Sequence, residues 1–294
     1  MSQTTPPPLA LHKLPIGATF AEAYSLVFAR LGPLVKAAAI PYLISTVLAV
    51  LSFRAQSNWA LTMLVAIMGF VPYTIFGVSW HRLTLLGPGA GAPSMTPAWK
   101  RRHSRFLGYA LAVTLIGYGL VLVIVLSGVL LAMPLGASAE LILALAVIFG
   151  GSIVFLYVVV RLSFVFPAVA VDEAYRLAHA WTHTRGQGFR LIGLMILTAL
   201  PMIVAYWALG GILSLAFLGH LTMPMGTEGV PPEAVMQDFV AENAAPLIAF
   251  QLIMTAVGYL LTALMVSAIS IAFRSCTGWV PAAGGAVMQG TRED

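Results

Sequence analysis

Six apolar runs constrain this chain more than any other feature of its sequence, because each is long enough to cross a bilayer as a helix. A helix needs about 20 residues, rising about 1.5 Å per residue, to span roughly 30 Å of hydrocarbon. The runs are continuous and lack period-2 alternation, which favours helices over a membrane β-barrel. The sequence therefore predicts an all-α, polytopic membrane helix bundle. Its six transmembrane helices are expected near residues 34–53, 59–80, 106–133, 141–160, 191–218 and 246–273.

The composition excludes a water-soluble enzyme or binding module. Of 294 residues, 60% are hydrophobic and 9% are charged, whereas a soluble domain carries roughly 25% charged residues. The single cysteine, Cys276, excludes an internal disulfide and cysteine-rich zinc or iron–sulfur sites. The Pro-rich start lacks the apolar core of a signal peptide. We expect a flexible N-terminal tail over residues 1–18, a six-span membrane domain over 19–280 and a flexible C-terminal tail over 281–294.

The few cations lie almost entirely on one side of the predicted spans. Of the 15 Lys and Arg residues, Arg54 alone falls on the other side. This asymmetry is a strong positive-inside signal and predicts a multi-pass protein with both termini in the cytoplasm. The acidic residues agree, because the loop at 219–245 contains several of them and no Lys or Arg. Within that loop, residues 231–240 are expected to form a short amphipathic helix on the outer surface.

The cytoplasmic segments show a threefold pattern that predicts an internal repeat. Before the first, third and fifth spans an alanine and an aromatic residue precede a basic residue. These aromatic residues are Tyr24, Trp99 and Trp181. After the second, fourth and sixth spans an arginine precedes a proline by a short interval. These arginines are Arg82, Arg161 and Arg274.

The repeat predicts three helical hairpins, each preceded by a cytoplasmic interfacial helix whose aromatic residue is an anchor in the headgroup layer. The first helix is expected from Thr19, because Thr19-Phe20-Ala21-Glu22 matches a capping box. The second is expected from Thr96-Pro97, an N-cap followed by proline, and the third near Asp172. The alternative is that these helices are elbows that only fix the entry angle of the next span.

The densest cluster of cations is the run from Trp99 to Arg105. It can hold anionic lipid headgroups, with about 1 kcal/mol from each cation near the surface, or act only as the anchor that fixes topology. If the hairpins are pseudo-symmetric, the arginines after the even spans converge on one phosphate; otherwise each one snorkels to the interface. The hypothetical lipid- or phosphate-binding residues are Arg82, Lys100, Arg101, Arg102, Arg105, Arg161 and Arg274.

Other candidate chemistry is sparse. His179 and His183 share a helix face with Asp172 at a spacing that permits metal ligation, although two histidines on a wet helix are more often a solvated surface. The sequence has no nucleophile motif, phosphate-binding loop or nucleic-acid-binding module, and the predicted spans contain no Asp or Glu. We therefore expect no enzymatic activity, no metal, no cofactor and no nucleic-acid partner.

The segment RLSFVFPAVAVDE, from Arg161 to Glu173, is followed by Ala180-Trp181 and by Thr184-Arg185-Gly186. This arrangement resembles poorly characterised bacterial six-span inner-membrane proteins, a group similar to the membrane domain of glycerophosphodiester phosphodiesterases. The match covers residues 161–186, with weaker echoes at 20–41 and 96–110. The catalytic domain of those enzymes is a soluble domain that this chain is expected to lack. The resemblance therefore implies a lipid-facing role in a bacterial inner (cytoplasmic) membrane and supplies no catalytic residue.

Two functions remain open at this point. The first is a non-enzymatic scaffold or accessory factor that engages anionic membrane lipids, or a membrane-protein partner, at the cytoplasmic face. The alternative is a transporter or permease component for a small or lipid-like substrate. A transporter predicts a polar cavity at mid-membrane depth, lined by residues such as Gln251, Thr255, Thr198 and Ser152.

Overall fold

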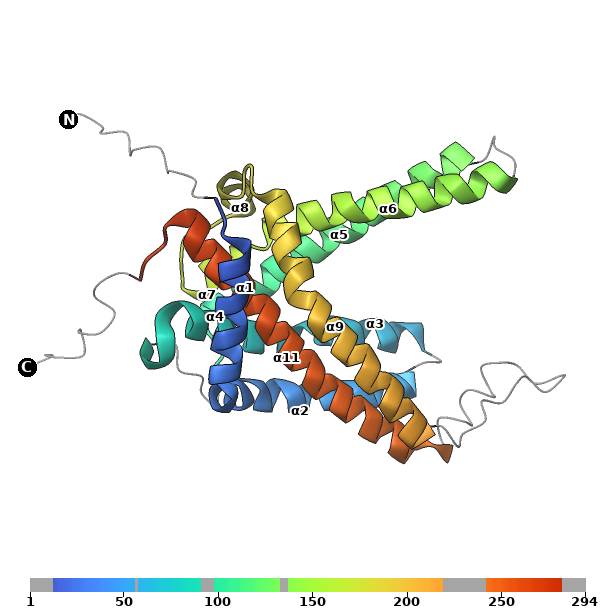
Figure 1. Cartoon of the computed structure of the whole chain (residues 1–294). Coiled ribbons are helices and arrows are strands. Elements are labelled where there is room, and N and C mark those ends of the chain that lie inside the picture. Colours follow the sequence, from blue (N-terminus) through green and yellow to red (C-terminus); the bar gives the residue numbers. More distant parts are fainter. Residues whose placement is uncertain (1–12, 56–57, 91–97, 133–136, 219–241, 282–294) are drawn as a thin grey trace, which may run out of the picture.

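The computed structural model describes residues 13–55, 58–90, 98–132, 137–218 and 242–281, and within these ranges all regular structure is helical (Figure 1). The tails up to residue 12 and from residue 282, and the amphipathic helix expected at 231–240, lie outside the described residues. The helices are α1 (Ile16–Ala29), α2 (Leu31–Ala55), α3 (Trp59–Met68), α4 (Phe70–Ala90), α5 (Arg101–Ala132), α6 (Ala137–Leu162), α7 (Val165–Ala170), α8 (Leu177–His183), α9 (Gly188–Leu218) and α11 (Ala244–Thr277).

Six stretches are long and apolar enough to cross a membrane, which confirms the predicted polytopic bundle. They are Leu31–Ser52, Trp59–Gly89, Arg101–Leu131, Ala146–Ala170, Gly188–Ala216 and Ala244–Thr277. The second stretch is divided into α3 and α4 near Gly69. Pro72 has no amide hydrogen to donate to the carbonyl four residues earlier, at Met68, which weakens the helix at this point.

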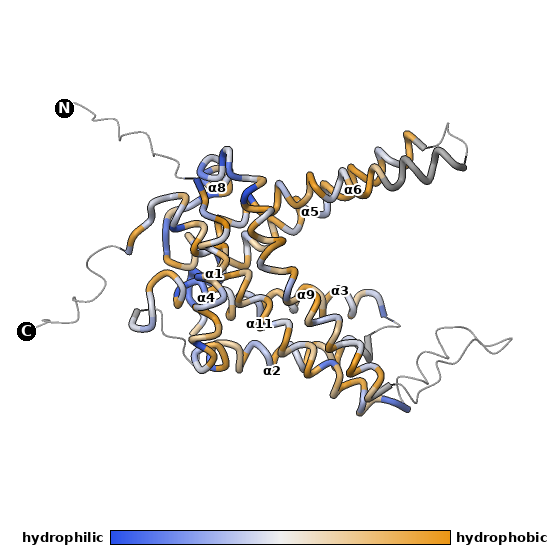
Figure 2. The backbone as a smooth tube through the Cα atoms, in the orientation of Figure 1, coloured by the Kyte–Doolittle hydropathy of each residue, from blue (hydrophilic) through white to orange (hydrophobic). Residues whose placement is uncertain are grey.

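Successive spans pack as pairs: α2 with α4, α5 with α6, and α9 with α11. Helix α11 occupies the middle of the bundle, where it contacts α1, α2, α4 and α9. The α5–α6 hairpin projects away from the other spans and joins them at one end through α4, α7, α8 and α9 (Figure 1). We call this end, which carries α1, α7, α8 and the C-terminal end of α11, the base. Many of the hydrophilic described segments lie at the base, around α8 and α4, while the projecting α5–α6 hairpin is largely apolar (Figure 2).

The helices that precede the spans differ from the expected pattern. Helix α1 begins at Ile16 after Pro15, so Thr19 lies inside the helix and is buried, and the predicted capping box is wrong. The described residues before α5 form no separate interfacial helix; Trp99 lies just outside α5. Thr96 and Pro97 lie outside the described residues. The short helix before the last hairpin, α8, begins at Leu177 rather than near Asp172, because the chain turns between α7 and α8.

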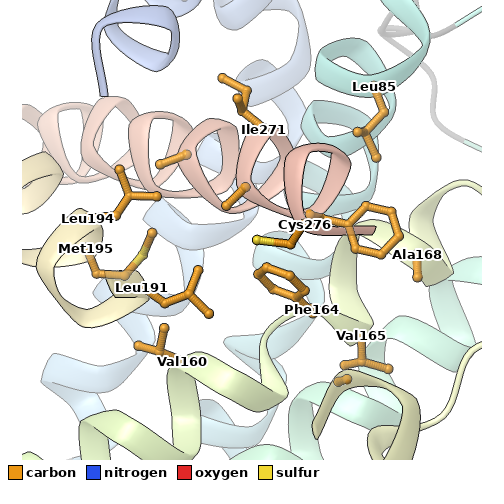
Figure 3. Packing of buried hydrophobic residues seen from close by; sticks show 14 of the residues in the cluster. Leu85, Val160, Phe164, Val165, Ala168, Leu191, Leu194, Met195, Ile271 and Cys276 are labelled. Atoms are coloured by element: carbon orange, nitrogen blue, oxygen red, sulfur yellow. The ribbon is translucent and has the colours of Figure 1, made fainter. Parts of the chain in front are cut away.

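The core of the base is a hydrophobic cluster to which α1, α4, α5, α6, α7, α8, α9 and α11 all contribute buried side chains. Phe164 and Cys276 lie side by side at its centre, with Leu191 and Leu194 of α9 on one side and Val165 and Ala168 on the other (Figure 3). Leu14, which falls within the range 1–18 expected to be a tail, is also fully buried in this cluster.

A second cluster joins α1, α2, α4 and α11 through Val27, Phe76 and Tyr259. Trp80 at its centre donates its indole N–H to the Ala263 carbonyl (3.0 Å) and to the Ser267 hydroxyl (2.9 Å), which fixes α4 against α11. Because lipid tails are as apolar as these side chains, packing and hydrogen bonds such as these hold helices together within a membrane.

Candidate functional site

The candidate site is built around residues 165–176, which comprise α7 and the turn after it; we call this segment the elbow. All of α7 except Phe166 is buried, and the helix packs between α4 and α5. It ends in a Schellman motif, in which the Glu173 amide donates to the Ala168 carbonyl (3.0 Å) and the Asp172 amide donates to the Val169 carbonyl (3.1 Å). Asp172 has a φ of 66° and takes the left-handed position that glycine usually fills in this motif.

Two arginines from different helices share the carboxylate of Asp172. Arg102 of α5 donates to Oδ2 of Asp172, and Nη1 of Arg82 on α4 lies 3.5 Å from the same oxygen. Arg82 also donates to the Ala170 carbonyl (3.1 Å) at the end of α7. The two arginine side chains are 24% and 14% exposed, whereas that of Asp172 is 55% exposed. The carboxylate therefore lies on the solvent side of two largely covered guanidinium groups.

Three further contacts fix the rest of the elbow. Arg105 donates to the Glu173 carbonyl (3.1 Å), and Tyr109 donates to the Tyr175 carbonyl (3.0 Å), so α5 holds the turn from one side. The Trp279 indole, just after α11, donates to the Glu173 carboxylate (2.9 Å). Elements from the second, third and last spans thus meet at the elbow. Sequence reasoning proposed no such role for Glu173 or Trp279, because nothing local in the sequence pairs residues so far apart.

Arg161 at the end of α6 is buried, with 5% exposure, in a pocket of neutral groups. It donates to the Thr184 hydroxyl (3.0 Å), to the Tyr157 hydroxyl (3.1 Å) and to the Trp181 carbonyl. Its guanidinium carbon lies 3.6 Å from the centre of the Trp181 ring, a cation–π contact that is worth about 2 kcal/mol when desolvated. Among the described residues no carboxylate pairs with Arg161. This pocket joins α6 to α8 and fixes the entry of α9.

The three arginines expected to converge on one phosphate have separate partners. Arg82 binds the elbow, Arg161 binds the pocket beside α8, and Arg274 pairs with Glu22 of α1 at 2.5 Å. No partner atom is shared among them in the described contacts. The structure instead brings Arg82 together with Arg102, a pair that is separated in sequence and comes from different hairpins.

The basic run before and within α5 is divided between two environments. Arg102 and Arg105 turn inward to the elbow, whereas Lys100 and Arg101 are exposed. The neighbouring Trp99 is 47% exposed and donates to the Ser104 hydroxyl (2.8 Å). This division has helical geometry as its cause, because residues one position apart point about 100° away from each other.

Of the other two predicted anchors, Trp181 is 41% exposed and stacks on Arg161. Tyr24 is half-buried in α1, and its hydroxyl donates to the Thr198 carbonyl of α9 (2.9 Å). Tyr24 therefore holds α1 against α9 within the protein. Burial raises the pKa of its phenol, which keeps the hydroxyl protonated as a donor.

The histidine pair beside the elbow has protein partners. Nδ1 of His183 lies 2.7 Å from the Tyr175 hydroxyl, and Nδ1 of His179 accepts from the Arg176 amide (3.3 Å). Burial, and next the neighbouring His179, lower the pKa of His183, while burial raises the pKa of Tyr175. Both groups are therefore neutral near pH 7. Among the described residues no group of three His, Cys, Asp or Glu side chains is placed to hold a metal ion.

Of the four polar residues expected to line a transport path, Gln251 and Thr255 lie together, whereas Thr198 and Ser152 lie on other helices. Gln251 donates to Thr255 (3.2 Å), and both line a cleft between α2 and α11 of about 10 Å³, together with Thr46. A cavity needs roughly 10–15 Å³ to hold even one water molecule. Thr198 is buried in α9, and Ser152 is exposed on α6, where it donates to the Ile148 carbonyl (2.6 Å).

Comparison of the chain with protein-family models, with curated proteins and with solved structures finds no match in any of the three. The site consists of an elbow held by inward-facing arginines, with an exposed cation pair and an exposed indole near it, at one end of a bundle of six apolar spans.

Proposed function

We propose that this chain is a non-enzymatic scaffold or accessory protein that engages anionic lipid, or a membrane-protein partner, at the cytoplasmic face of a bacterial inner membrane. The observation that carries the proposal is the exposed pair Lys100–Arg101 beside the half-exposed indole of Trp99. Cations near a membrane surface attract anionic headgroups, and an indole ring suits the headgroup layer. The distribution of charge supports the orientation, with both termini cytoplasmic.

The contacts that tie the base together support a role in holding and presenting a surface. The inward-facing arginines fix the ends of several spans to the elbow, so the start of α5 is held in place relative to the other helices. Lys100 and Arg101 then project from a fixed frame. The transporter alternative gains no support from the cleft between α2 and α11, which has room for about one water molecule.

The proposed function can be tested by the lipids that the protein retains. The full chain is reconstituted in bilayers that contain phosphatidylglycerol and phosphatidylcholine, extracted gently and examined by native mass spectrometry. We expect wild type to enrich phosphatidylglycerol, and Lys100→Gln/Arg101→Gln to reduce this enrichment about 10- to 30-fold, from about 1 kcal/mol per cation.

The matched control is Lys36→Gln/Arg185→Gln, which removes two exposed cations from other parts of the chain. We expect the control to retain most of the bound phosphatidylglycerol. Equal losses in the two double variants would show a response to total charge and would refute a localised lipid site. No enrichment in wild type would refute lipid engagement altogether and would leave the membrane-protein partner as the proposed ligand, to be found by co-purification.

A further inference from the structure

Cations outnumber carboxylates at the elbow and in the adjoining first turn of α5. The carboxylates are those of Asp172 and Glu173. The cations are Arg82, Arg102 and Arg105, which contact the elbow, Arg176, which lies within it, and Lys100 and Arg101, which precede Arg102 in the chain. Glu173 accepts its side-chain hydrogen bond from the Trp279 indole, so Asp172 is the carboxylate that meets the guanidinium groups. Partly buried cations in excess of their counter-ions favour the binding of a further anion.

Asp172 occupies a backbone position that glycine usually fills. At φ 66° in a Schellman motif, glycine would be the least strained residue. An aspartate there costs conformational energy that glycine avoids, and its carboxylate meets both Arg82 and Arg102. The residue with this backbone conformation is therefore the one whose carboxylate contacts the two guanidinium groups.

The arrangement around that carboxylate fits a phosphate group better than it fits a carboxylate. Both arginines approach one oxygen, Oδ2 of Asp172, from two different helices. A phosphate offers additional acceptor oxygens, so each guanidinium can bind an oxygen of its own, in the forked geometry that arginine favours. Because the Asp172 side chain is 55% exposed, it can turn outward to make room without unfolding the elbow.

We propose that Arg82 and Arg102 form a phosphate-binding site that the Asp172 carboxylate occupies in this structure, so that Asp172 competes with the phosphate group of an anionic lipid. The proposal rests on the proposed function and deepens it. It places the lipid phosphate at these two arginines, next to the exposed Lys100 and Arg101, and identifies the internal group that limits the affinity.

The test removes the competing charge while keeping the backbone. Asp172→Asn and Asp172→Gly both tolerate a φ of 66°. Short-chain phosphatidylglycerol is titrated against the full chain in zwitterionic detergent, and binding is measured by native mass spectrometry. We expect both variants to bind phosphatidylglycerol about tenfold more tightly than wild type, which corresponds to about 1.4 kcal/mol. Adding Arg102→Gln to Asp172→Asn should abolish the gain.

The matched control is Glu173→Gln, which removes one negative charge at the residue next to Asp172. The Glu173 carboxylate accepts a hydrogen bond from the Trp279 indole. We expect this control to change the affinity less than twofold. Equal gains in Asp172→Asn and Glu173→Gln, or no gain in either Asp172 variant, would overturn the proposal.

Two further readouts distinguish a lipid phosphate site at Arg82 and Arg102 from a general charge effect and from a site for free phosphate. Phosphatidylglycerol should raise the Tm of Asp172→Asn more than that of wild type, because the ligand replaces the missing counter-ion; an equal rise would count against the proposal. A gain for inorganic phosphate without a gain for phosphatidylglycerol would assign the site to free phosphate and overturn the lipid assignment. If Lys100→Gln/Arg101→Gln lowers lipid retention while Asp172→Asn changes nothing, the proposed function stands and this inference fails.

Discussion

Replacement of Gly188 by alanine tests how the Arg161 pocket fixes the entry of α9. A Cβ atom added at Gly188 would lie 2.3 Å from Cε2 and 2.9 Å from Cδ2 of the Tyr157 ring. The Tyr157 ring also contacts Phe189, and its hydroxyl binds Arg161. The ring therefore has to move by about an ångström to restore an ordinary contact, and it has little freedom to do so without losing the bond to Arg161.

The expected cost follows from these contacts. Inserting a methyl group into a packed site costs about 1–3 kcal/mol. Loss of a hydrogen bond to a charged group costs about 1.5–3 kcal/mol. Because the two effects share the same ring movement, we expect a total loss of about 2–4 kcal/mol in the free energy of unfolding. At about 2–4 °C per kcal/mol, the value for a domain of 150–250 residues, Tm should fall by about 4–16 °C.

The chain contains a suitable reporter for this measurement. Cys276 is the only cysteine and is buried in the core of the base, so a thiol-reactive fluorophore reports unfolding as Cys276 becomes accessible. The control is Gly193→Ala on the same helix, where the added Cβ would meet its nearest neighbour, Cδ1 of Ile16, at an ordinary 3.8 Å. We expect this control to be as stable as wild type, or more stable by up to about 1 kcal/mol from helix propensity.

A double-mutant cycle with Tyr157→Phe tests whether Gly188→Ala lowers stability by displacing the Tyr157 ring or by a general effect of the substitution on the start of α9. Tyr157→Phe alone removes the hydroxyl that binds Arg161. If Gly188→Ala acts by displacing this ring, the two losses should be less than additive. Full additivity, or a Gly188→Ala variant as stable as Gly193→Ala, would refute the reasoning.

Two further predictions concern the α5–α6 hairpin and the His183–Tyr175 pair. Gly151→Ala places a Cβ 2.5 Å from Cγ2 of Ile124, whereas the Cβ of the adjacent Gly150→Ala meets nothing within 4 Å. We expect Gly151→Ala to be about 1–3 kcal/mol less stable than Gly150→Ala in the same thiol assay. Equal stabilities of the two variants would contradict this packing. The lowered pKa of His183 means that the unfolded chain binds more protons than the folded chain from about pH 6.5 downward. Stability should therefore fall as the pH drops through that range, and His183→Asn should reduce the fall; an unchanged pH profile would exclude His183 as its source.

The spans could be predicted from the sequence because their length and apolar character depend on local composition alone. The starts of the cytoplasmic helices could not. Thr19 and Glu22 have the spacing of a capping box, yet Pro15 starts the helix earlier, and Glu22 is drawn to Arg274 on a helix at the other end of the chain. The motif is not used because the helix has already begun at Ile16, which places Thr19 inside the helix. The repeat in the sequence likewise predicted shared roles for arginines that the fold gives to different partners.

The candidate site was predictable in its residue types and not in its pairings. The density of cations around Lys100 singled out the start of α5, and the segment from Arg161 to Glu173 singled out the elbow. The exact partners depend on how hairpins pack together. Arg161 binds Thr184 and Trp181 some 20 residues later, and Arg82 meets Asp172 across two spans. Such contacts have no periodic signature in a single sequence, because they join elements whose mutual orientation is set by the whole bundle.

The cations of this protein divide by chemistry as well as by position. All of the lysines, Lys13, Lys36 and Lys100, are exposed. Five of the arginines instead donate to main-chain carbonyls at turns and near helix ends; the pairs are Arg30 to Leu83, Arg82 to Ala170, Arg105 to Glu173, Arg161 to Trp181 and Arg190 to Leu14.

The difference between arginine and lysine follows from the unpaired carbonyl groups at helix ends in a membrane protein. Carbonyls in the last turn of a helix lack an intrahelical partner, and lipid offers no donor to replace it. A guanidinium group supplies several donors in a fixed plane, whereas a lysine ammonium is a compact and strongly hydrated charge. The arginines at the base can therefore serve both as topological signals and as structural donors. Exposed cations such as Lys100 and Arg101 remain to act outside the protein, which is why the proposed lipid contact begins there.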